Sequence, residues 1–300
     1  MQAAQAMTTV HLANRTIVSV SGPDAEHFLQ NILTTDLDKL GAGGAKPGAL
    51  LTPQGKILFD FLISRSGADG FLLDCRIDVA DDFVRRLMLY KLRAKVEIAK
   101  RDQQLVSVSW ETDSGTSHSD STAALGGSPV RDLRFPESAA VYRSYGPALP
   151  GTGTETDWAA LRVAHGIAES GSDYALGDAF PHDVLLDQMD GVGFKKGCYV
   201  GQEVVSRMQH RGTARRRVLI VASDQDLPSA GTDITADGRS VGTLGTVAGE
   251  GGLAIARIDR VKDAVDSGTP LLAGDVGVAL SIPDWAKFSF PQDAASAADA

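Results

Sequence analysis

A cysteine with glycines on both sides lies in the segment of the chain that is richest in chemically useful residues, GFKKGCYVGQEVVSRMQHRGTARRR (residues 193–217). Gly197 and Gly201 permit positive φ or a close approach of the backbone on either side of Cys198. The sequence GQEVVSRM that follows is typical of a helix start. The positive end of a helix dipole, together with the neighbouring Lys196, favours the thiolate. The pattern therefore predicts a partly ionised, nucleophilic thiol.

The alternative is that Cys198 is a small buried hydrophobic residue. No Ser/His/Asp or Cys/His arrangement indicates a hydrolase, and His182 and His210 are candidates by residue type only. The chain has two cysteines, which are too few for a zinc or iron–sulfur site built by this chain alone. We therefore expect no metal site of its own.

Basic residues are concentrated between Arg207 and Arg217, and two interpretations stay open. In one, Arg215, Arg216 and Arg217 form a solvated face that leads into a strand. In the other, the run lines a binding site for a polyanion such as a polyglutamyl tail or a phosphate backbone. No aromatic residues alternate with the basic ones, so stacking on single-stranded nucleic acid is not expected.

The composition is that of an ordinary globular protein, with 43% hydrophobic and 22% charged residues and a net charge of −9. An acidic chain is not expected to bind nucleic acid non-specifically or to bind an anionic membrane. The N-terminal residues lack the pattern of a secretory signal, and the apolar runs fall short of the roughly 18–20 residues that span a bilayer. Few cysteines indicate a reducing compartment, and we expect a cytoplasmic protein.

Several elements must position this segment. Alternating apolar residues predict one strand over residues 8–20, and a helix follows Asp24, with Phe28, Leu29, Ile32 and Leu33 at helical spacing. Three strands joined by turns are expected over 41–75, an amphipathic helix from 79, a strand through 101–110 and a helix ending at Gly166. Residues 170–192 are predicted to be mostly loop.

The final third of the chain has a different pattern, because short β-rich runs alternate there with Gly, Asp and Pro. This is typical of a small antiparallel barrel. The expected domains are an α+β region over 1–220, built of two subdomains with a mobile loop near 111–129, a β-barrel over 221–288, and a disordered tail over 289–300.

The cysteine segment resembles the signature of the YgfZ-type folate-binding proteins, Lys-Gly-Cys-aromatic-x-Gly-Gln-Glu. The matching residues are Lys196, Gly197, Cys198, Tyr199, Gly201, Gln202 and Glu203. FLQNILTTDL (residues 28–37), which contains Asp36, is similar to an N-terminal segment of that family, and LLTPQGKILFDFLI, YKLRAKVEI, RVAHGIAE and FPHD follow in the family's order. The resemblance covers roughly residues 10–285.

That family is related to the T-protein of the glycine cleavage system, an aminomethyltransferase that uses tetrahydrofolate. The resemblance implies an α+β fold with T-protein-like folate-binding domains around a central channel and a C-terminal antiparallel β-barrel. It implies tetrahydrofolate or another reduced folate as the ligand. It also implies assembly or repair of iron–sulfur clusters in 4Fe–4S enzymes, with client enzymes and cluster-assembly proteins as partners.

The resemblance further assigns candidate folate contacts. Many relatives carry Pro-x-Glu ahead of the signature, where this chain has Pro181-His182-Asp183. Either Asp183 or Glu169 is then the carboxylate that pairs with the pterin edge, and a loop-capping role for Asp183 is the alternative. Asp36 is a candidate for the folate N5/N10 edge.

Four signature residues are also candidate ligand contacts. Lys196 would neutralise a folate glutamate or the cysteine thiolate. Tyr199 is a further candidate contact to the folate. Gln202 and Glu203 either contact the ligand or hold the segment by hydrogen bonds to backbone N–H groups.

Three functions follow from these observations. The first is a tetrahydrofolate-binding accessory protein for iron–sulfur clusters. In it Cys198 either handles a cluster or sulfur species transiently or forms a covalent adduct with a one-carbon or oxidised group. The second is a tetrahydrofolate-dependent aminomethyltransferase or demethylase, which the cysteine argues against because T-protein chemistry needs no thiol. The third is a binding module for RNA or an RNA-modifying enzyme, motivated by Arg207–Arg217. Whether the protein catalyses turnover stays open.

Overall fold

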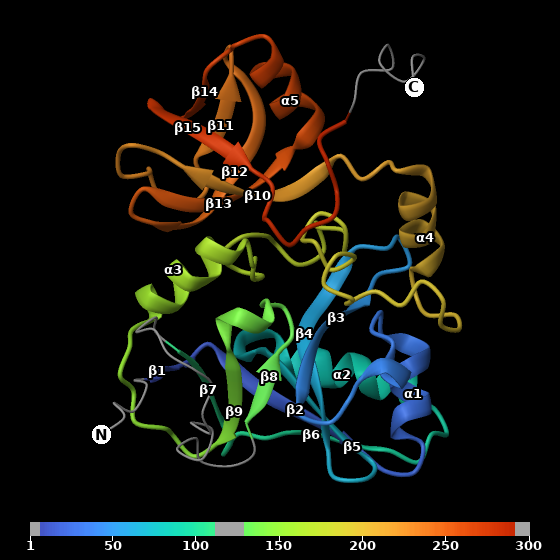
Figure 1. Ribbon diagram of the computed structural model, residues 1–300. Coiled ribbons are helices and arrows are strands. Elements are labelled where there is room, and N and C mark those ends of the chain that lie inside the picture. The colour runs from blue at the N-terminus through green and yellow to red at the C-terminus, as the bar shows by residue number, and fades with distance from the viewer. Residues whose placement is uncertain (1–6, 112–128, 292–300) are drawn as a thin grey trace. The chain divides into compact units, whose positions relative to one another are not determined.

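The structure is a computed structural model that describes residues 7–111 and 129–291. The chain divides into two compact units (Figure 1), which we call the N-terminal unit and the barrel unit. The N-terminal unit comprises the residues up to Trp158 together with Met189–Val204, and the barrel unit comprises Ala159–Gln188 and the residues from Val205 onward. The loop expected near 111–129 and most of the expected tail lie outside the described residues.

The described part of the N-terminal unit contains a nine-stranded sheet in the order β1-β7-β9-β8-β3-β4-β5-β2-β6. Neighbouring strands are antiparallel except β3 and β8, which are parallel. The strands are β1 (Met7–His11), β2 (Arg15–Ser21), β3 (Gly44–Leu51), β4 (Ile57–Ser66), β5 (Gly70–Arg76), β6 (Glu97–Lys100), β7 (Leu105–Glu111), β8 (Val130–Asp132) and β9 (Tyr142–Gly146).

The single strand expected over residues 8–20 is wrong, because the chain turns between His11 and Arg15. The Arg15 amide donates to the Leu12 carbonyl at 3.1 Å. The strands on either side of this turn pair with different neighbours, β1 with β7 and β2 with β5 and β6. The expected strand–turn–strand–turn–strand over 41–75 is confirmed by β3, β4 and β5.

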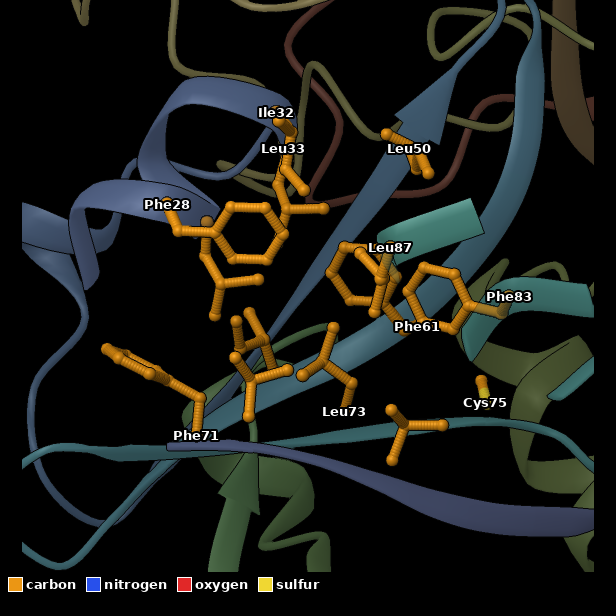
Figure 2. Packing of buried hydrophobic residues seen from close by; sticks show 14 of the residues in the cluster. Phe28, Ile32, Leu33, Leu50, Phe61, Phe71, Leu73, Cys75, Phe83 and Leu87 are labelled. Atoms are coloured by element: carbon orange, nitrogen blue, oxygen red, sulfur yellow. The ribbon is translucent and has the colours of Figure 1, made fainter. Parts of the chain in front are cut away.

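Two α-helices supply apolar side chains to the core of this unit, α1 (Ala25–Ile32) and α2 (Ala80–Lys91). Figure 2 shows side chains from α1, α2 and strands β3, β4 and β5 meeting in one cluster. The Phe83 ring stacks on Phe59 and Phe61, with ring centroids 5.0 and 5.6 Å apart. Asp24 stands at the N-cap of α1 without capping it, because its carboxylate accepts the Lys95 amide at 2.7 Å. Three short 3₁₀ helices complete the described elements of this part: Leu37–Lys39, Ile77–Val79 and Glu137–Ala139.

A buried network of charged side chains connects strands β5, β8 and β9. Arg143 is fully buried, and its guanidinium donates to Asp74 at 3.3 Å and to Asp132 at 3.1 Å. Arg134 pairs with the same Asp132 at 2.8 Å, and Arg15 pairs with Asp74. Because removing one member of such a network leaves a buried charge without compensation, these residues fix the strands together.

The barrel unit contains a closed barrel in the order β10-β13-β12-β11-β14-β15, which confirms the expected α+β class with a C-terminal antiparallel barrel. Its strands are β10 (Arg216–Ala222), β11 (Asp233–Ala236), β12 (Arg239–Ala248), β13 (Gly251–Arg257), β14 (Leu271–Ala273) and β15 (Val276–Ser281). The boundary expected near residue 220 falls inside β10. An unexpected helix, α5 (Ile258–Asp266), follows β13 and buries Ile258, Val261 and Ala264.

The chain passes between the units three times: within α3 (Glu155–His165), between Gln188 and Met189, and within α4 (Gln202–Arg211). Helix α3 ends before Gly166, as expected, and this glycine has φ +68°. A Cβ at Gly166 would lie 2.4 Å from Cγ of Pro283, so there is also no room for a side chain at this position. Residues 170–192 are mostly loop, as predicted.

Candidate functional site

Residues 189–204, which we call the signature segment, lie in the N-terminal unit and have no regular structure until α4 begins at Gln202. Hydrogen bonds join its first residues to the chain just after α1. The Gly193 amide donates to the Thr34 carbonyl at 2.7 Å, and the Thr34 hydroxyl donates to the Gly191 carbonyl at 2.8 Å. An ion pair between Lys46 and Asp190 adds a third contact. The segment is therefore held tightly although it is irregular.

Lys196 makes a further contact with the chain just after α1. Its Nζ atom donates to the carbonyl oxygens of Leu33 at 2.6 Å and Thr35 at 2.8 Å. The ammonium also lies 5.2 Å from the centre of the Tyr199 ring. Burial lowers the pKa of Lys196 to about 8, although the nearby carboxylates oppose that shift. This amine points into the protein and is engaged with backbone carbonyls.

Gly193 makes room for the Lys196 side chain. A Cβ at Gly193 would lie 2.6 Å from Cδ of Lys196 and 3.0 Å from Cβ of Asp36. Since real Cβ contacts are not that short, any other residue at 193 would displace the lysine or the backbone beside Asp36.

Asp36 lies beside Lys196 and is 6% exposed. Its carboxylate accepts a hydrogen bond from the Gln30 amide at 3.0 Å and pairs with Lys39 at 3.3 Å. Burial acts to raise the pKa of Asp36, but the hydrogen bonds from Gln30 and Lys39 outweigh it, and the pKa is lowered. Asp36 is thus an ionised group with its partners already in place.

Cys198 is exposed, so the interpretation of it as a buried hydrophobic residue is wrong. The next residue, Tyr199, is 7% exposed, and burial raises the pKa of its phenol to about 12. The chain's other cysteine, Cys75, is buried in the core cluster (Figure 2), and burial raises the pKa of its thiol to about 12. The two thiols therefore occupy opposite environments.

Gly201 holds the other end of the segment against the β3–β4 hairpin. It has φ +79°, and a Cβ there would lie 2.5 Å from the Thr52 carbonyl oxygen and 3.1 Å from Cα of Gly55. Gly197, in contrast, has no neighbouring heavy atom within 4 Å of such a Cβ. Only Gly201 of the two glycines uses the conformational freedom that the sequence suggested. Cys198 is thus presented between two anchored residues, Lys196 and Gly201.

Gln202 and Glu203 are the first two residues of α4. Gln202 is half-buried and Glu203 is exposed. The Gln202 amide donates to the Tyr199 carbonyl at 3.3 Å, which closes the turn into the helix. Whether either side chain contacts a ligand stays a prediction.

The remaining two predicted contacts, Asp183 and Glu169, lie in the barrel unit. Asp183 is 2% exposed, and its carboxylate accepts the Phe180 amide at 3.1 Å within the turn that contains it. Burial raises its pKa, against the hydrogen bond and nearby arginines. Glu169 is 8% exposed and lies 3.4 Å from the Arg162 guanidinium.

These positions bear on the fit of a folate. A carboxylate that clamps a pterin edge must offer two oxygens at an accessible surface. Asp36, Asp183 and Glu169 are each buried and already have partners inside the protein. Asp183 and Glu169 at the pterin edge, and Asp36 at the folate N5/N10 edge, therefore stay predictions.

The basic run is largely paired with acidic residues of the barrel unit. Arg217 is buried and donates to Asp187 at 2.7 Å and to the His182 carbonyl at 2.9 Å. Arg215 and Arg216 are exposed, but they pair with Asp259 at 3.4 Å and Asp178 at 3.6 Å. His182 itself is buried and contacts Gln209. The second half of the run is thus engaged within the barrel unit, and a polyanion contact by its first half, Arg207–Arg211, stays a prediction.

The sequence did not indicate the residues that support the site, namely Gln30, Thr34 and the carbonyls of Leu33 and Thr35. Gln30 and Thr34 belong to FLQNILTTDL, so the resemblance was the available signal. Within the described ranges, no group of three or more His, Cys, Asp and Glu side chains is arranged to hold a metal ion. No helix there is long and apolar enough to cross a membrane.

Comparisons with known proteins identify two matching domains and several relatives of this chain. Residues 3–109 match the GCVT N-terminal domain, and residues 215–288 match the CAF17 C-terminal beta-barrel domain. The chain is 32% identical to the human iron-sulfur cluster assembly factor IBA57, mitochondrial, over 94% of this chain and 86% of that protein. The corresponding Mus musculus protein is 31% identical over 93% and 86% of the two chains.

A solved structure also resembles this chain. The glycine cleavage system aminomethyltransferase T from Bartonella henselae superposes with a TM-score of 0.69 over 95% of this chain and 88% of that one. At 14% identity this likeness concerns the fold alone. The relatives named above correct one expectation: they are mitochondrial proteins, so the assignment of this chain to the cytoplasm is wrong.

Proposed function

Because this chain belongs to the IBA57/CAF17 family of iron–sulfur cluster assembly factors, we propose that it assists cluster assembly by lending the Cys198 thiolate to a cluster in transit. The observation that carries the proposal is the exposure of this one thiol on an anchored segment. The other cysteine, Cys75, is buried and has a raised pKa, which makes it a poor ligand.

The anchors on both sides of Cys198 support this role. Lys196 is fixed by two backbone carbonyls, and Gly201 is packed against the backbone of the β3–β4 hairpin. A ligand whose flanking residues are held this way loses little conformational entropy when it binds a metal centre. The thiol is thus accessible and also oriented before a cluster arrives.

A partner protein must supply the remaining ligands. An iron–sulfur cluster is held by several thiolates, four in the common types. The described residues of this chain contain no group of three potential ligands, and Cys198 is the one exposed cysteine among them. A cluster bound here is therefore shared, with cluster-assembly proteins and 4Fe–4S client enzymes as the partners. This function involves no step through a folate.

The proposal is tested by complementation of a strain that lacks the gene. The full chain carrying Cys198→Ala is expected to leave the activity of 4Fe–4S enzymes at the level of the deletion. Cys75→Ala is the matched control, and it is expected to restore activity once its protein level equals that of the wild type. Full restoration of 4Fe–4S enzyme activity by Cys198→Ala would contradict the proposal.

A further inference from the structure

The most exposed apolar side chains of the described N-terminal unit lie together at the C-terminal end of α2. Met88 is 48% exposed, Leu89 is 69% exposed and Leu92 is 88% exposed. The opposite side of the same helix packs Phe83 and Leu87 fully into the core. Helix α2 therefore has two apolar faces, of which the core covers only one. Scattered exposed apolar residues are ordinary, whereas three within five positions form a patch.

Cations surround these apolar side chains. Residues 85–95 contain Arg85, Arg86, Lys91, Arg93 and Lys95 and no acidic residue, in a chain whose net charge is −9. Arg85, Arg86 and Arg93 are exposed. Arg85 pairs with Asp82 one turn earlier, whereas Arg86 and Arg93 have no carboxylate partner among the described residues. We call Arg85, Arg86, Met88, Leu89, Leu92 and Arg93 the α2 patch.

The backbone at Leu92 is unfavourable for leucine. Its φ is +46° and its ψ is −108°, a conformation that suits glycine. The Leu92 side chain is 88% exposed, so packing within the chain does little to offset this unfavourable backbone conformation. A strained, solvent-facing leucine indicates a contact made outside this chain.

We propose that the α2 patch is a docking surface for an acidic protein, whose carboxylates pair with the guanidinium groups of Arg86 and Arg93 and whose apolar surface covers Leu89 and Leu92. Charge complementarity carries the choice of partner. The planar guanidinium group pairs with a carboxylate through two parallel hydrogen bonds. Arginine and methionine are also enriched at protein interfaces.

A protein fits this surface better than an anionic membrane. The N-terminal end of the same helix carries Asp81 and Asp82, both exposed, and Asp78 precedes it. A flat lipid surface would meet the whole helix, including these carboxylates, whereas a protein contacts only the C-terminal half. The docking surface does not involve Cys198, and its existence does not depend on the cluster chemistry proposed above.

Site-specific photocrosslinking in living cells tests the proposal. The full chain carries p-benzoylphenylalanine in place of Leu89 or, as the matched control, in place of Val265, which is 63% exposed on α5 beside acidic residues. We expect a discrete crosslinked protein from position 89 and none from position 265. Peptide mapping is expected to place the crosslink next to Asp and Glu residues of the partner.

A charge reversal completes the test. A variant that combines Arg86→Glu and Arg93→Glu, both on the exposed surface, is expected to reduce the yield of crosslinked product from position 89 at least tenfold. The thermal unfolding of the chain is expected to stay unchanged. The proposal is overturned if position 89 gives no more product than position 265, if the yield survives the charge reversal, or if the crosslinked species is a lipid.

Discussion

Lys196 and Cys198 are two residues apart in the signature segment and have opposite surroundings. The lysine ammonium is inserted between two backbone carbonyls, and the cysteine thiol faces solvent. A buried ammonium costs free energy unless hydrogen bonds compensate it, and the Leu33 and Thr35 carbonyls do so here. At the scale of single residues, the lysine thus holds the segment in place and the cysteine is the residue left to react.

The first prediction concerns the two thiols. In the native protein, a thiol reagent such as 5,5′-dithiobis(2-nitrobenzoate) is expected to modify Cys198 rapidly and Cys75 only after unfolding, because Cys75 is buried and its thiol pKa is raised to about 12. The measurement is the number of thiols titrated before and after denaturant is added. Two rapidly reacting thiols in the native state would show that the core around Cys75 is open.

The second prediction concerns the pH dependence of stability. The folded state lowers the pKa of Lys196 from 10.5 to about 8, mainly through burial. Between these values the unfolded chain binds more protons at this site than the folded chain, so this contribution to stability rises with pH and is lost as the pH falls through about 8. The free energy of unfolding of the wild type, relative to Lys196→Met, is therefore expected to increase from pH 8 to pH 10.

Urea unfolding of both proteins at pH 7, 8, 9 and 10 measures this difference. The comparison with Lys196→Met removes the contributions of other titrating groups that the two proteins share. A difference that stays constant across the four pH values would contradict the buried position of the amine.

At the scale of elements, the β3–β4 hairpin positions the signature segment. The hairpin closes through the Thr52 amide, which donates to the Lys56 carbonyl at 2.8 Å, and Gly201 packs directly against this turn. Both Gly201 and Gly55 have positive φ, +79° and +81°. The backbones of these two glycines pack closely, so the hairpin turn and the signature segment are in direct contact.

The third prediction follows from this contact. Gly201→Ala is expected to destabilise the protein by about 2 kcal/mol or more, because φ is positive and the new Cβ would meet backbone atoms that cannot rotate away. Gly197→Ala is the control, since a Cβ there has open space, and it is expected to change stability by less than about 0.5 kcal/mol. The midpoints of urea unfolding measure both, and equal effects would contradict the packing described.

Periodicity and turn residues predicted many of the elements. The helix through Phe28, Leu29 and Ile32 formed as expected, because its apolar residues repeat at helical spacing. The turn between β1 and β2 was missed because no glycine or proline marks it. Helix α5 was missed because its nine residues directly follow a strand, and three buried positions are too few to reveal a helical period.

The candidate site was predictable only in part. The conformational need for glycine at 201 was visible in the sequence, and so was the unusual setting of Cys198. The partners of Lys196 were not visible, because they are backbone carbonyls more than 160 residues away and any residue type can supply them. The hydrogen bond from the Phe180 amide to Asp183, only three residues apart, agrees with the loop-capping alternative that the sequence had left open for Asp183.

At the scale of the whole molecule, net charge conceals the distribution of charge. The chain has a net charge of −9, yet residues 85–95 carry five cations and no carboxylate, while the arginines at 215–217 are paired with aspartates. Arg215, Arg216 and Arg217 are thus each paired with an aspartate, whereas on α2 Arg85 pairs with Asp82 and Arg86 and Arg93 are exposed without a carboxylate partner among the described residues. Interactions between exposed charges fade beyond about 8 Å at physiological salt, so the local pattern governs recognition.

The central claim concerns one exposed thiol that completes a cluster held mainly by another protein. The most direct measurement is native mass spectrometry of the anaerobically mixed full chain and a cluster-loaded assembly protein from the same cell. We predict a complex of the two proteins with an intact cluster for the wild type and Cys75→Ser, and loss of the cluster-containing complex for Cys198→Ser. A cluster-containing complex that forms equally well with Cys198→Ser would contradict the account.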